Sequence, residues 1–547
     1  MHKIHKTLIL LITAAVPLVL GGCSGAAADK KADVADFQTQ NETVIPATDE
    51  ITAVDLSAHS ETILLDQGGV YLLTGSLSGG QIVIDAAKDD SVELILSGAS
   101  ITSTFGAAVN CRQAKDLIIT LQDDTENFLT DASEYHFDDP SGDEPDAALF
   151  GKADIIIRGN GALTVEGNYK HGIASKDDLK IESGMINVTS VSDALRGKDS
   201  VTVRDGSVNI RAGKDGIAAT NGKEENKGRI EISGGTFSIT SGGDAIQAET
   251  TLKITGGDFT ITTEGQSTGS SESQKGIKAK DLLQIEGGKF HLFTQDDAIH
   301  SDLDVTISGG DFYIETDDDG IHADRDLVIN DGGFNIPVCY EGMEGTTVTV
   351  NGGNIFIDAR DDAIGAAAGT EEAGALNDRS GNPAVWVSVN GGEIEAVSGG
   401  DTVDSNGNIF VSGGKLRLSS PAEPYYEGVL LCNGRVTVTG GDLAMAGNIG
   451  VELTVENQPM LLISYRNSQP KGSVISLRDK SGRVVLETLS RKDYTQAIFS
   501  SSELEIGKTY TVYSDDRKIT DVKLNGMINK AADDGGEFTG GYPRGHW

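Results

Sequence analysis

The sequence predicts an all-β protein whose main domain is a right-handed parallel β-helix with about 22 residues per coil. A small residue followed by an aliphatic one, as in Ala298-Ile299 and Gly320-Ile321, returns most often after 22 residues. Gly-Gly pairs such as Gly287-Gly288 and Gly309-Gly310 keep the same spacing. The runs between these markers alternate apolar and polar residues, as in 311–314, and show neither helix caps nor a helical stripe. Coils of this kind stack into ladders of like residues about 4.8 Å apart, and right-handed crossovers are the expected ones.

The N-terminus has the pattern of a lipoprotein signal peptide. A basic stretch at 2–6 precedes an apolar run at 8–20, which is shorter than a membrane-spanning helix needs to be. The run ends in Leu20-Gly21-Gly22-Cys23, which resembles a bacterial lipobox; an ordinary signal peptide with a coincidental cysteine is the alternative. We therefore expect a signal peptide at 1–22 and a lipid on Cys23. This lipid alone would hold the protein in the bacterial cell membrane, on its extracellular face.

The predicted β-helix follows a flexible tether at 23–50, a stretch that is polar and aperiodic. The β-helix is expected to span 51–455 and to contain roughly fifteen coils. Steps longer than 22 residues mark loops inserted into single coils, at 130–146, 222–228, 264–274 and 369–383. The stack is expected to continue across each of these insertions.

The pattern changes after residue 455. Apolar runs at 460–465 and 510–513 are typical of strands joined by ordinary turns, and 480–483 is a hairpin candidate. We expect a small antiparallel β-domain at 456–528 that caps the open end of the stack, because exposed strand edges must be protected. Residues 529–547 are Gly-rich and are expected to form a disordered tail.

Charge and cysteine content restrict the partners. The chain has 44 Lys and Arg against 83 Asp and Glu, a formal charge of 44 − 83 = −39. Such a surface repels nucleic acid, which is not expected as a partner, and it repels an acidic polysaccharide unless a cation bridges the two. Beyond Cys23 only Cys111, Cys339 and Cys432 remain, with no Cys-x-x-Cys spacing, so neither a zinc motif nor a complete disulfide framework is expected. We expect a monomer.

An acidic residue precedes the small marker in coil after coil. From residue 297 onward these positions are 297, 319, 341 and 362, at steps of 22, 22 and 21. Stacked carboxylates repel one another, and a bound Ca²⁺, which takes six to eight oxygen ligands, removes that repulsion. The candidate calcium ligands are Asp296, Asp297, Asp318, Asp319, Glu341, Asp361 and Asp362. The alternative is a corner preference, because Asp accepts hydrogen bonds from neighbouring backbone N–H groups.

Two histidines lie in the same segment. His300 and His322 are 22 residues apart, and each follows the aliphatic marker of its coil. With Asp302 and Asp324 they could form a transition-metal site. A stack of surface imidazoles is the simpler interpretation.

Several motifs together resemble a known family. They are Gly68-Gly69-Val70-Tyr71-Leu72-Leu73-Thr74-Gly75-Ser76-Leu77, Gly159-Asn160-Gly161-Ala162-Leu163-Thr164-Val165, His171-Gly172-Ile173-Ala174-Ser175-Lys176-Asp177-Asp178-Leu179 and the turn at 121–130. With the repeated coils, they make residues 51–528 similar to the clostridial family of secreted carbohydrate-binding β-helix proteins, related in shape to calcium-dependent pectate lyases. The resemblance implies a right-handed parallel β-helix, bound calcium, and binding to plant cell-wall polysaccharides such as cellulose and polygalacturonate. It does not specify which carboxylates hold calcium here.

Three functions remain open. The first, which we favour, is a non-catalytic, calcium-dependent binder of acidic polysaccharide or β-glucan. Trp386 is the only Trp before the tail, so a flat aromatic platform for cellulose is hard to build and acidic glycans are favoured. The second is a calcium-dependent pectate lyase, whose base would be Lys275, Lys278, Lys280 or Arg325; hydrolysis by a carboxylate pair is also open. The third is a structural surface adhesin that calcium stiffens.

Overall fold

The fold is all-β, as predicted. The computed structural model describes residues 42–48, 50–137, 143–265, 273–368, 381–422, 428–449 and 453–533. All of them belong to one compact unit, Asn41–Trp547, whereas Met1–Gln40, which contains the predicted signal peptide and Cys23, lies outside the described residues. Apart from the short 3-10 turn η1 (Leu56–Ala58), the regular elements in these ranges are β-strands. None of the described elements is a helix long and apolar enough to cross a membrane.

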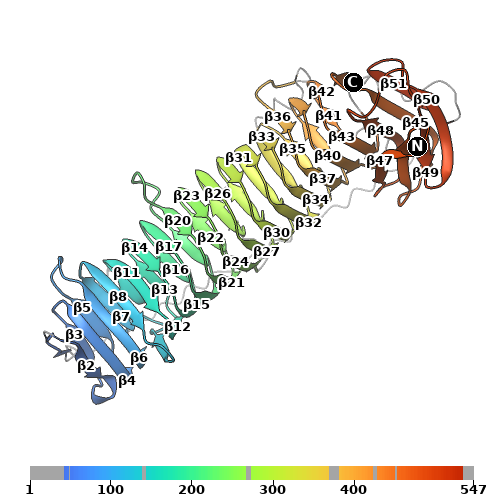
Figure 1. Ribbon diagram of the computed structural model, residues 1–547. Coiled ribbons are helices and arrows are strands. Elements are labelled where there is room, and N and C mark those ends of the chain that lie inside the picture. Colours follow the sequence, from blue (N-terminus) through green and yellow to red (C-terminus); the bar gives the residue numbers. More distant parts are fainter. Residues whose placement is uncertain are drawn as a thin grey trace, which may run out of the picture. The chain divides into compact units, whose positions relative to one another are not determined.

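Three parallel ladders, here named A, B and C, form the β-helix, and each coil visits them in that order (Figure 1). Ladder A contains β1 (Glu42–Val44), β3 (Thr62–Leu65), β5 (Ile82–Asp85), β7 (Val109–Gln113), β10 (Ala147–Gly151), β13 (His171–Ser175), β16 (Leu195–Gly197), β19 (Ile217–Ala219), β22 (Ile246–Ala248), β25 (Ile277–Ala279), β28 (Ile299–Ser301), the first parts of β31 (Ile321–Ile329) and β33 (Met343–Val350), β35 (Ile364–Ala366), β38 (Val403–Ser405) and β41 (Leu431–Cys432). Ladder B contains β2 (Thr52–Asp55), the first parts of β4 (Gly69–Gly79) and β6 (Val92–Ser103), β8 (Asp116–Leu121), β11 (Asp154–Gly159), β14 (Asp178–Ile181), β17 (Ser200–Val203), β20 (Arg229–Ile232), β23 (Thr251–Ile254), β26 (Leu282–Ile285), β29 (Asp304–Ile307), the later parts of β31 and β33, β36 (Trp386–Val389), β39 (Asn408–Val411), β42 (Val436–Val438) and β44 (Leu453–Val455). Ladder C contains the later parts of β4 and β6, β9 (Glu126–Thr130), β12 (Ala162–Gly167), β15 (Met185–Ser190), β18 (Ser207–Ala212), β21 (Thr236–Ser241), β24 (Asp258–Thr263), β27 (Lys289–Thr294), β30 (Asp311–Thr316), β32 (Gly333–Cys339), β34 (Asn354–Ala359), β37 (Glu393–Val397), β40 (Lys415–Ser419) and β43 (Asp442–Ala446).

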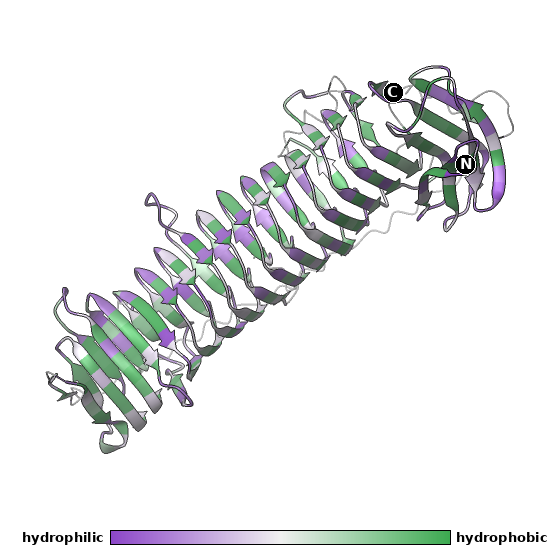
Figure 2. Cartoon of the chain, viewed as in Figure 1, coloured by the Kyte–Doolittle hydropathy of each residue, from purple (hydrophilic) through white to green (hydrophobic). Residues whose placement is uncertain are grey.

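The core consists of like residues stacked from coil to coil. Ile277, Ile299 and Ile321 are direct partners in ladder A and are fully buried, so the small-plus-aliphatic marker is the inward corner of each coil. Inside ladder C, rings stack with centroid separations of 4.6, 4.9, 4.6 and 4.8 Å, in the order Phe237, Phe259, Phe290, Phe312, Phe334. Figure 2 shows the alternation of hydrophobic and hydrophilic residues along the strands. The predicted 22-residue repeat is thus the period of one core layer.

The Gly-Gly marker turns the chain from ladder B into ladder C. Gly257 has φ +120, in the region that favours glycine, and a Cβ built on it would lie 2.8 Å from the Phe259 ring. The glycine therefore serves two needs, the turn and room for the stacked ring.

Strands extend into both the predicted tether and the predicted tail. At the start, β1 pairs with β3, although its residues fall in the predicted tether 23–50, because the backbone of β3 offers a free edge to it. At the other end, β51 (Ile528–Ala532) enters the predicted tail 529–547, where it pairs in parallel with β45 (Met460–Gln469). The remaining tail residues, 534–547, lie outside the described part of the chain.

A small β-domain follows the last coils. Strand β48 (Tyr494–Ser500) pairs antiparallel with both β43 of ladder C and β45. A separate four-stranded antiparallel sheet has the order β47 (Val484–Leu489), β46 (Val474–Arg478), β49 (Thr509–Ser514) and β50 (Arg517–Lys523). Strand β48 therefore covers the edge that ladder C would otherwise expose.

Candidate functional site

The acidic column lies at the corner between ladders C and A. Asp215, Asp244, Asp297 and Asp319 are all buried. One oxygen of each accepts a hydrogen bond from the backbone N–H of the column residue in the next coil: the distance is 3.1 Å from Asp215 Oδ1 to Asp244 N and 3.3 Å from Asp297 Oδ1 to Asp319 N. The same bond joins Asp319 Oδ1 to Glu341 N at 3.1 Å. Corner hydrogen bonding therefore accounts for the recurrence of Asp without any ion.

A lysine neutralises the first part of the predicted calcium set, Asp296 and Asp297. Lys275 Nζ lies 2.5 Å from Asp296 Oδ1 and 2.7 Å from Asp297 Oδ2, and His300 Nδ1 lies 2.7 Å from the same Asp297 oxygen. Burial opposes ionisation of Asp297, but the hydrogen bonds from His300 and Lys275 outweigh it and hold the pKa of this carboxyl well below its usual range. A metal ion at Asp296 and Asp297 would have to displace the ammonium group.

In the second part of the set, carboxyl groups crowd one another. Burial, followed by repulsion from Glu344, Asp319 and the aspartates of the next coil, raises the pKa of Glu341 to about 9. Burial and the neighbouring Asp319 raise the pKa of Asp318 to about 6. In the next coil, Asp362 Oδ1 accepts from the backbone N–H of Asp401 at 2.6 Å. Among the described residues, no Lys or Arg forms an ion pair with Glu341, so this is where a cation is most strongly favoured.

The two histidines stack in register on ladder A, with ring centroids 5.1 Å apart. His322 Nδ1 lies 3.1 Å from Asp319 Oδ2 and 2.9 Å from Glu344 Oε2. Burial disfavours a charged imidazole, but hydrogen bonding to these two carboxylates raises the pKa of His322 to about 11. The histidines are thus surrounded by acidic groups.

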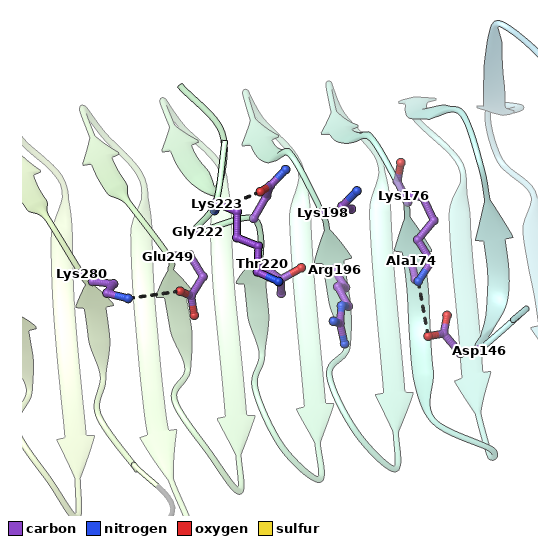
Figure 3. A pocket seen from close by; sticks show the side chains of 12 residues that line it. Asp146, Ala174, Lys176, Arg196, Lys198, Thr220, Gly222, Lys223, Glu249 and Lys280 are labelled. Carbon is purple, nitrogen blue, oxygen red and sulfur yellow. Dashed lines mark hydrogen bonds and ion pairs between the residues drawn. The ribbon is translucent and has the colours of Figure 1, made fainter. Parts of the chain in front are cut away.

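A basic groove on the same ladder was missed by sequence reasoning. It has a volume of about 540 Å³. Its lining includes five cationic side chains, namely Lys176, Arg196, Lys198, Lys223 and Lys280, with Asp146 and Glu249 as the acidic ones. Figure 3 shows Lys176 on one coil and Arg196 and Lys198 on the neighbouring coil. The 22-residue step from Lys176 to Lys198 was a usable signal.

Small residues open this groove. Ala174, Arg196 and Ala218 are direct partners on β13, β16 and β19, so Arg196 has an alanine on either side of it in the ladder. Arg196 Nη1 lies 3.2 Å from the buried Asp193 Oδ2, which fixes it in place. Lys198 and Lys223 form no ion pair with any carboxylate in the described ranges, and their ammonium groups are available to a ligand.

The four predicted bases are not brought together. Lys275 is held by two aspartates: burial opposes its charge, but attraction from Asp297 and hydrogen bonding outweigh it and raise its pKa, so it is a poor base. Arg325 is paired with Asp304, with Nε 2.7 Å from Oδ1. Lys278 Nζ lies 3.9 Å from Asp244 Oδ2. Of the four, only Lys280 lines the groove in the described structure.

Comparison with known proteins places the chain in a family. A family model described as "carbohydrate-binding domain-containing protein" matches residues 59–320 and 316–444. A protein of the same description from Acetivibrio thermocellus is 36% identical over 186 residues, which cover 34% of this chain and 65% of the relative, just under two thirds of its length. A solved structure, the polysaccharide lyase-like protein from C. thermocellum in a gadolinium derivative, matches with a TM-score of 0.37 and 31% identity over 45% of this chain and 96% of that one. The chain, a parallel β-helix with a basic groove beside an acidic corner, therefore belongs to the carbohydrate-binding domain-containing protein family.

Proposed function

We propose that this chain is a non-catalytic binder of acidic polysaccharide, and that the basic groove over β13 to β25 is its binding surface. The observation that carries the proposal is the convergence of five cationic side chains on one groove of a chain with a net charge of −39. Elsewhere such a chain repels an anionic polymer, so the groove is the favoured place of approach. Arg196 offers a planar donor pair that suits a carboxylate, and the lysines add point charges.

The arrangement of the cations suits a linear polymer. Lys176 and Lys198 follow β13 and β16, which are neighbours in ladder A. Adjacent strands lie about 4.8 Å apart, so positive charges recur along the stack axis. A polysaccharide with a carboxylate on each sugar, lying parallel to that axis, would meet a cation over several coils.

We further propose a calcium ion at the end of the acidic column that follows Asp319. Glu341, Asp361 and Asp362 would hold it with oxygen ligands from two adjacent coils, as Ca²⁺ prefers. The raised pKa of Glu341 supports this choice, because it reflects the closeness of several other carboxylates to this one. When bound, the ion would supply positive charge to an otherwise acidic surface, by which it could bridge protein and acidic glycan.

The proposed location is the cell surface. The predicted signal peptide, the lipid on Cys23 and the tether would hold the binding domain on the outer face of the bacterial membrane. Globomycin treatment of a bacterial host expressing the chain, followed by metabolic labelling with a fatty-acid analogue, tests this part: label must depend on Cys23 and disappear in Cys23→Ser.

One binding experiment tests the main proposal. Purified chain is mixed with polygalacturonate, with calcium or with EDTA, and both co-sedimentation and the absorbance of unsaturated product are followed. We expect co-sedimentation without product, with a loss in Arg196→Gln/Lys198→Gln. The matched control is Lys253→Gln/Lys289→Gln, two cations outside the groove. Unsaturated product would establish a lyase instead, and no binding in any condition would leave only the structural adhesin.

A further inference from the structure

His322 is placed as metal-binding histidines are. Its Nε2 lies 3.2 Å from Asp324 Oδ1, so this nitrogen can donate its proton to a carboxylate. Its Nδ1 lies 3.1 Å from Asp319 Oδ2 and 2.9 Å from Glu344 Oε2, so this nitrogen faces two carboxylates, and a metal ion bound by all three side chains would replace its proton. A histidine that ligates a metal through one nitrogen almost always donates its other N–H to a carboxylate, carbonyl or water, which orients the ring.

Two adjacent coils supply the converging atoms. Asp319 comes from the corner before β31, His322 from β31 and Glu344 from β33, and His322 and Glu344 are direct partners in ladder A. The three ligand atoms lie within 4.8 Å of one another. The side chains of His322 and Glu344 are each 23% exposed and that of Asp319 is 10% exposed, so the place where they meet can be reached from solvent.

The preceding coil provides an internal comparison. His300 repeats the arrangement, with Nε2 3.1 Å from Asp302 Oδ1 and Nδ1 2.7 Å from Asp297 Oδ2. There, however, Lys275 Nζ lies 2.7 Å from the same Asp297 oxygen and supplies the positive charge. Lys275 occupies the column position one coil before Asp297. The position one coil before Asp319 is Asp297, not a lysine, and Glu344 adds a second carboxylate beside His322. The His322 coil therefore has one more carboxylate than the His300 coil and no lysine beside it.

We propose that His322, Asp319 and Glu344 form a site for a divalent transition-metal ion of the zinc class. One imidazole and two carboxylates give three protein ligands and leave a fourth position open toward solvent. The imidazole nitrogen separates this site from a calcium site, because Ca²⁺ takes oxygen ligands, whereas imidazole suits zinc, copper and nickel. The open position could accept an oxygen atom of a bound ligand along ladder A.

The test uses the full chain without a histidine tag and Co²⁺ as a spectroscopic probe, with Zn²⁺ competition. We expect one equivalent to give visible absorption bands of low-coordinate Co²⁺, which Zn²⁺ abolishes and millimolar-range Ca²⁺ leaves in place. His322→Ala and Glu344→Gln should weaken binding by about 100-fold or more, and Asp324→Asn by about 10- to 100-fold. His291→Ala, on β27 of ladder C, is the control and should change the Kd by less than about threefold.

Several results would overturn the proposal. They are the absence of a saturable cobalt spectrum, equal binding by wild type and His322→Ala, and equal losses in His291→Ala and His322→Ala. Far-UV circular dichroism and thermal unfolding of Glu344→Gln show whether a loss reflects misfolding; a folded variant that still binds Co²⁺ like wild type contradicts the assignment. No polysaccharide is present, so the outcome is independent of the binding function proposed above.

Discussion

Two sectors of ladder A share one backbone and one core but have opposite charge. Between β13 and β25 the outward side presents the cations of the groove, and from β28 to β35 it presents His322, Glu344 and the acidic corner. Inward, both sectors carry the same aliphatic residues in register. Lys275 stands at the border, paired with Asp296 and Asp297. The comparison teaches that the repeat constrains only the residues that turn and pack, and leaves the outward positions free to diverge.

The largest expected effect comes from removing the border cation. Lys275→Gln leaves Asp296 and Asp297 without their ammonium partner, and the buried Asp297 carboxylate then keeps only His300 and the backbone N–H of Asp319. We expect a loss of about 3–5 kcal/mol in the free energy of unfolding, typical of breaking a buried ion pair. Urea unfolding at pH 7 measures it. Lys253→Gln, which removes an exposed cation paired with Glu286, should change stability by less than about 1 kcal/mol; equal losses in the two variants would contradict the distinct role of Lys275.

The second prediction concerns pH and Asp215, which lies in the column beside the groove. Burial and the neighbouring Asp193 and Asp244 raise the pKa of Asp215 to about 7, above its unfolded value near 3.8. Because the folded pKa is the higher one, the stabilising contribution of the protonated carboxyl is complete below about pH 3.8 and is lost as pH rises to about 7. Asp215→Asn keeps an oxygen for the N–H of Asp244 and should be more stable than wild type at pH 8, by at most about 4 kcal/mol. Thermal unfolding between pH 4 and 8 tests this; a difference that does not grow with pH would refute it.

The third prediction concerns the stabilisation of the acidic sector by calcium. Ca²⁺ at about 100 times its Kd should stabilise the folded chain by about 2.7 kcal/mol, because it binds the native state only. Glu341→Gln should be no less stable than wild type without the ion, since its carboxyl is repelled by its neighbours, and should lose the calcium response. Thermal unfolding with EDTA gives the stability without the ion, and unfolding with CaCl₂ gives the stabilisation by calcium. MgCl₂ at the same ionic strength is the control. A response that survives in Glu341→Gln would place calcium elsewhere.

The smallest expected effect is on ligand affinity. Lys198→Glu reverses one charge in the groove, at a side chain without an ion-pair partner in the described structure. We expect the Kd for polygalacturonate to rise about tenfold, or about 1.4 kcal/mol, with little change in unfolding. The difference between wild type and variant should shrink at high salt, because screening weakens exposed charge contacts. A salt-independent difference would indicate a structural cause.

The sequence was sufficient for the features that repeat. The spacing of Ile299 and Ile321 predicted the coil, and the Gly-Gly pairs predicted its turn, because packing and backbone conformation impose them in every coil. The groove could not be predicted in this way, since it depends on Ala174 and Ala218 flanking Arg196 across three coils. The pairing of Lys275 with two aspartates also escaped prediction, because which neighbour a lysine reaches is decided by side-chain geometry. Strand β51 was missed since its partner, β45, lies almost 70 positions away, as the pairing of Met460 with Ile528 shows.

The constant rise of ladder A has a consequence for selectivity among polymers. Strand pairing fixes the interval between outward side chains at about 4.8 Å, and no substitution on the surface can alter it. Under the binding function proposed above, a linear polysaccharide along ladder A would meet outward side chains at this fixed interval. A polymer whose repeat matches the interval is then expected to gain affinity with each added sugar, whereas a polymer with a different repeat is expected to lose register after a few sugars and to gain nothing from greater length.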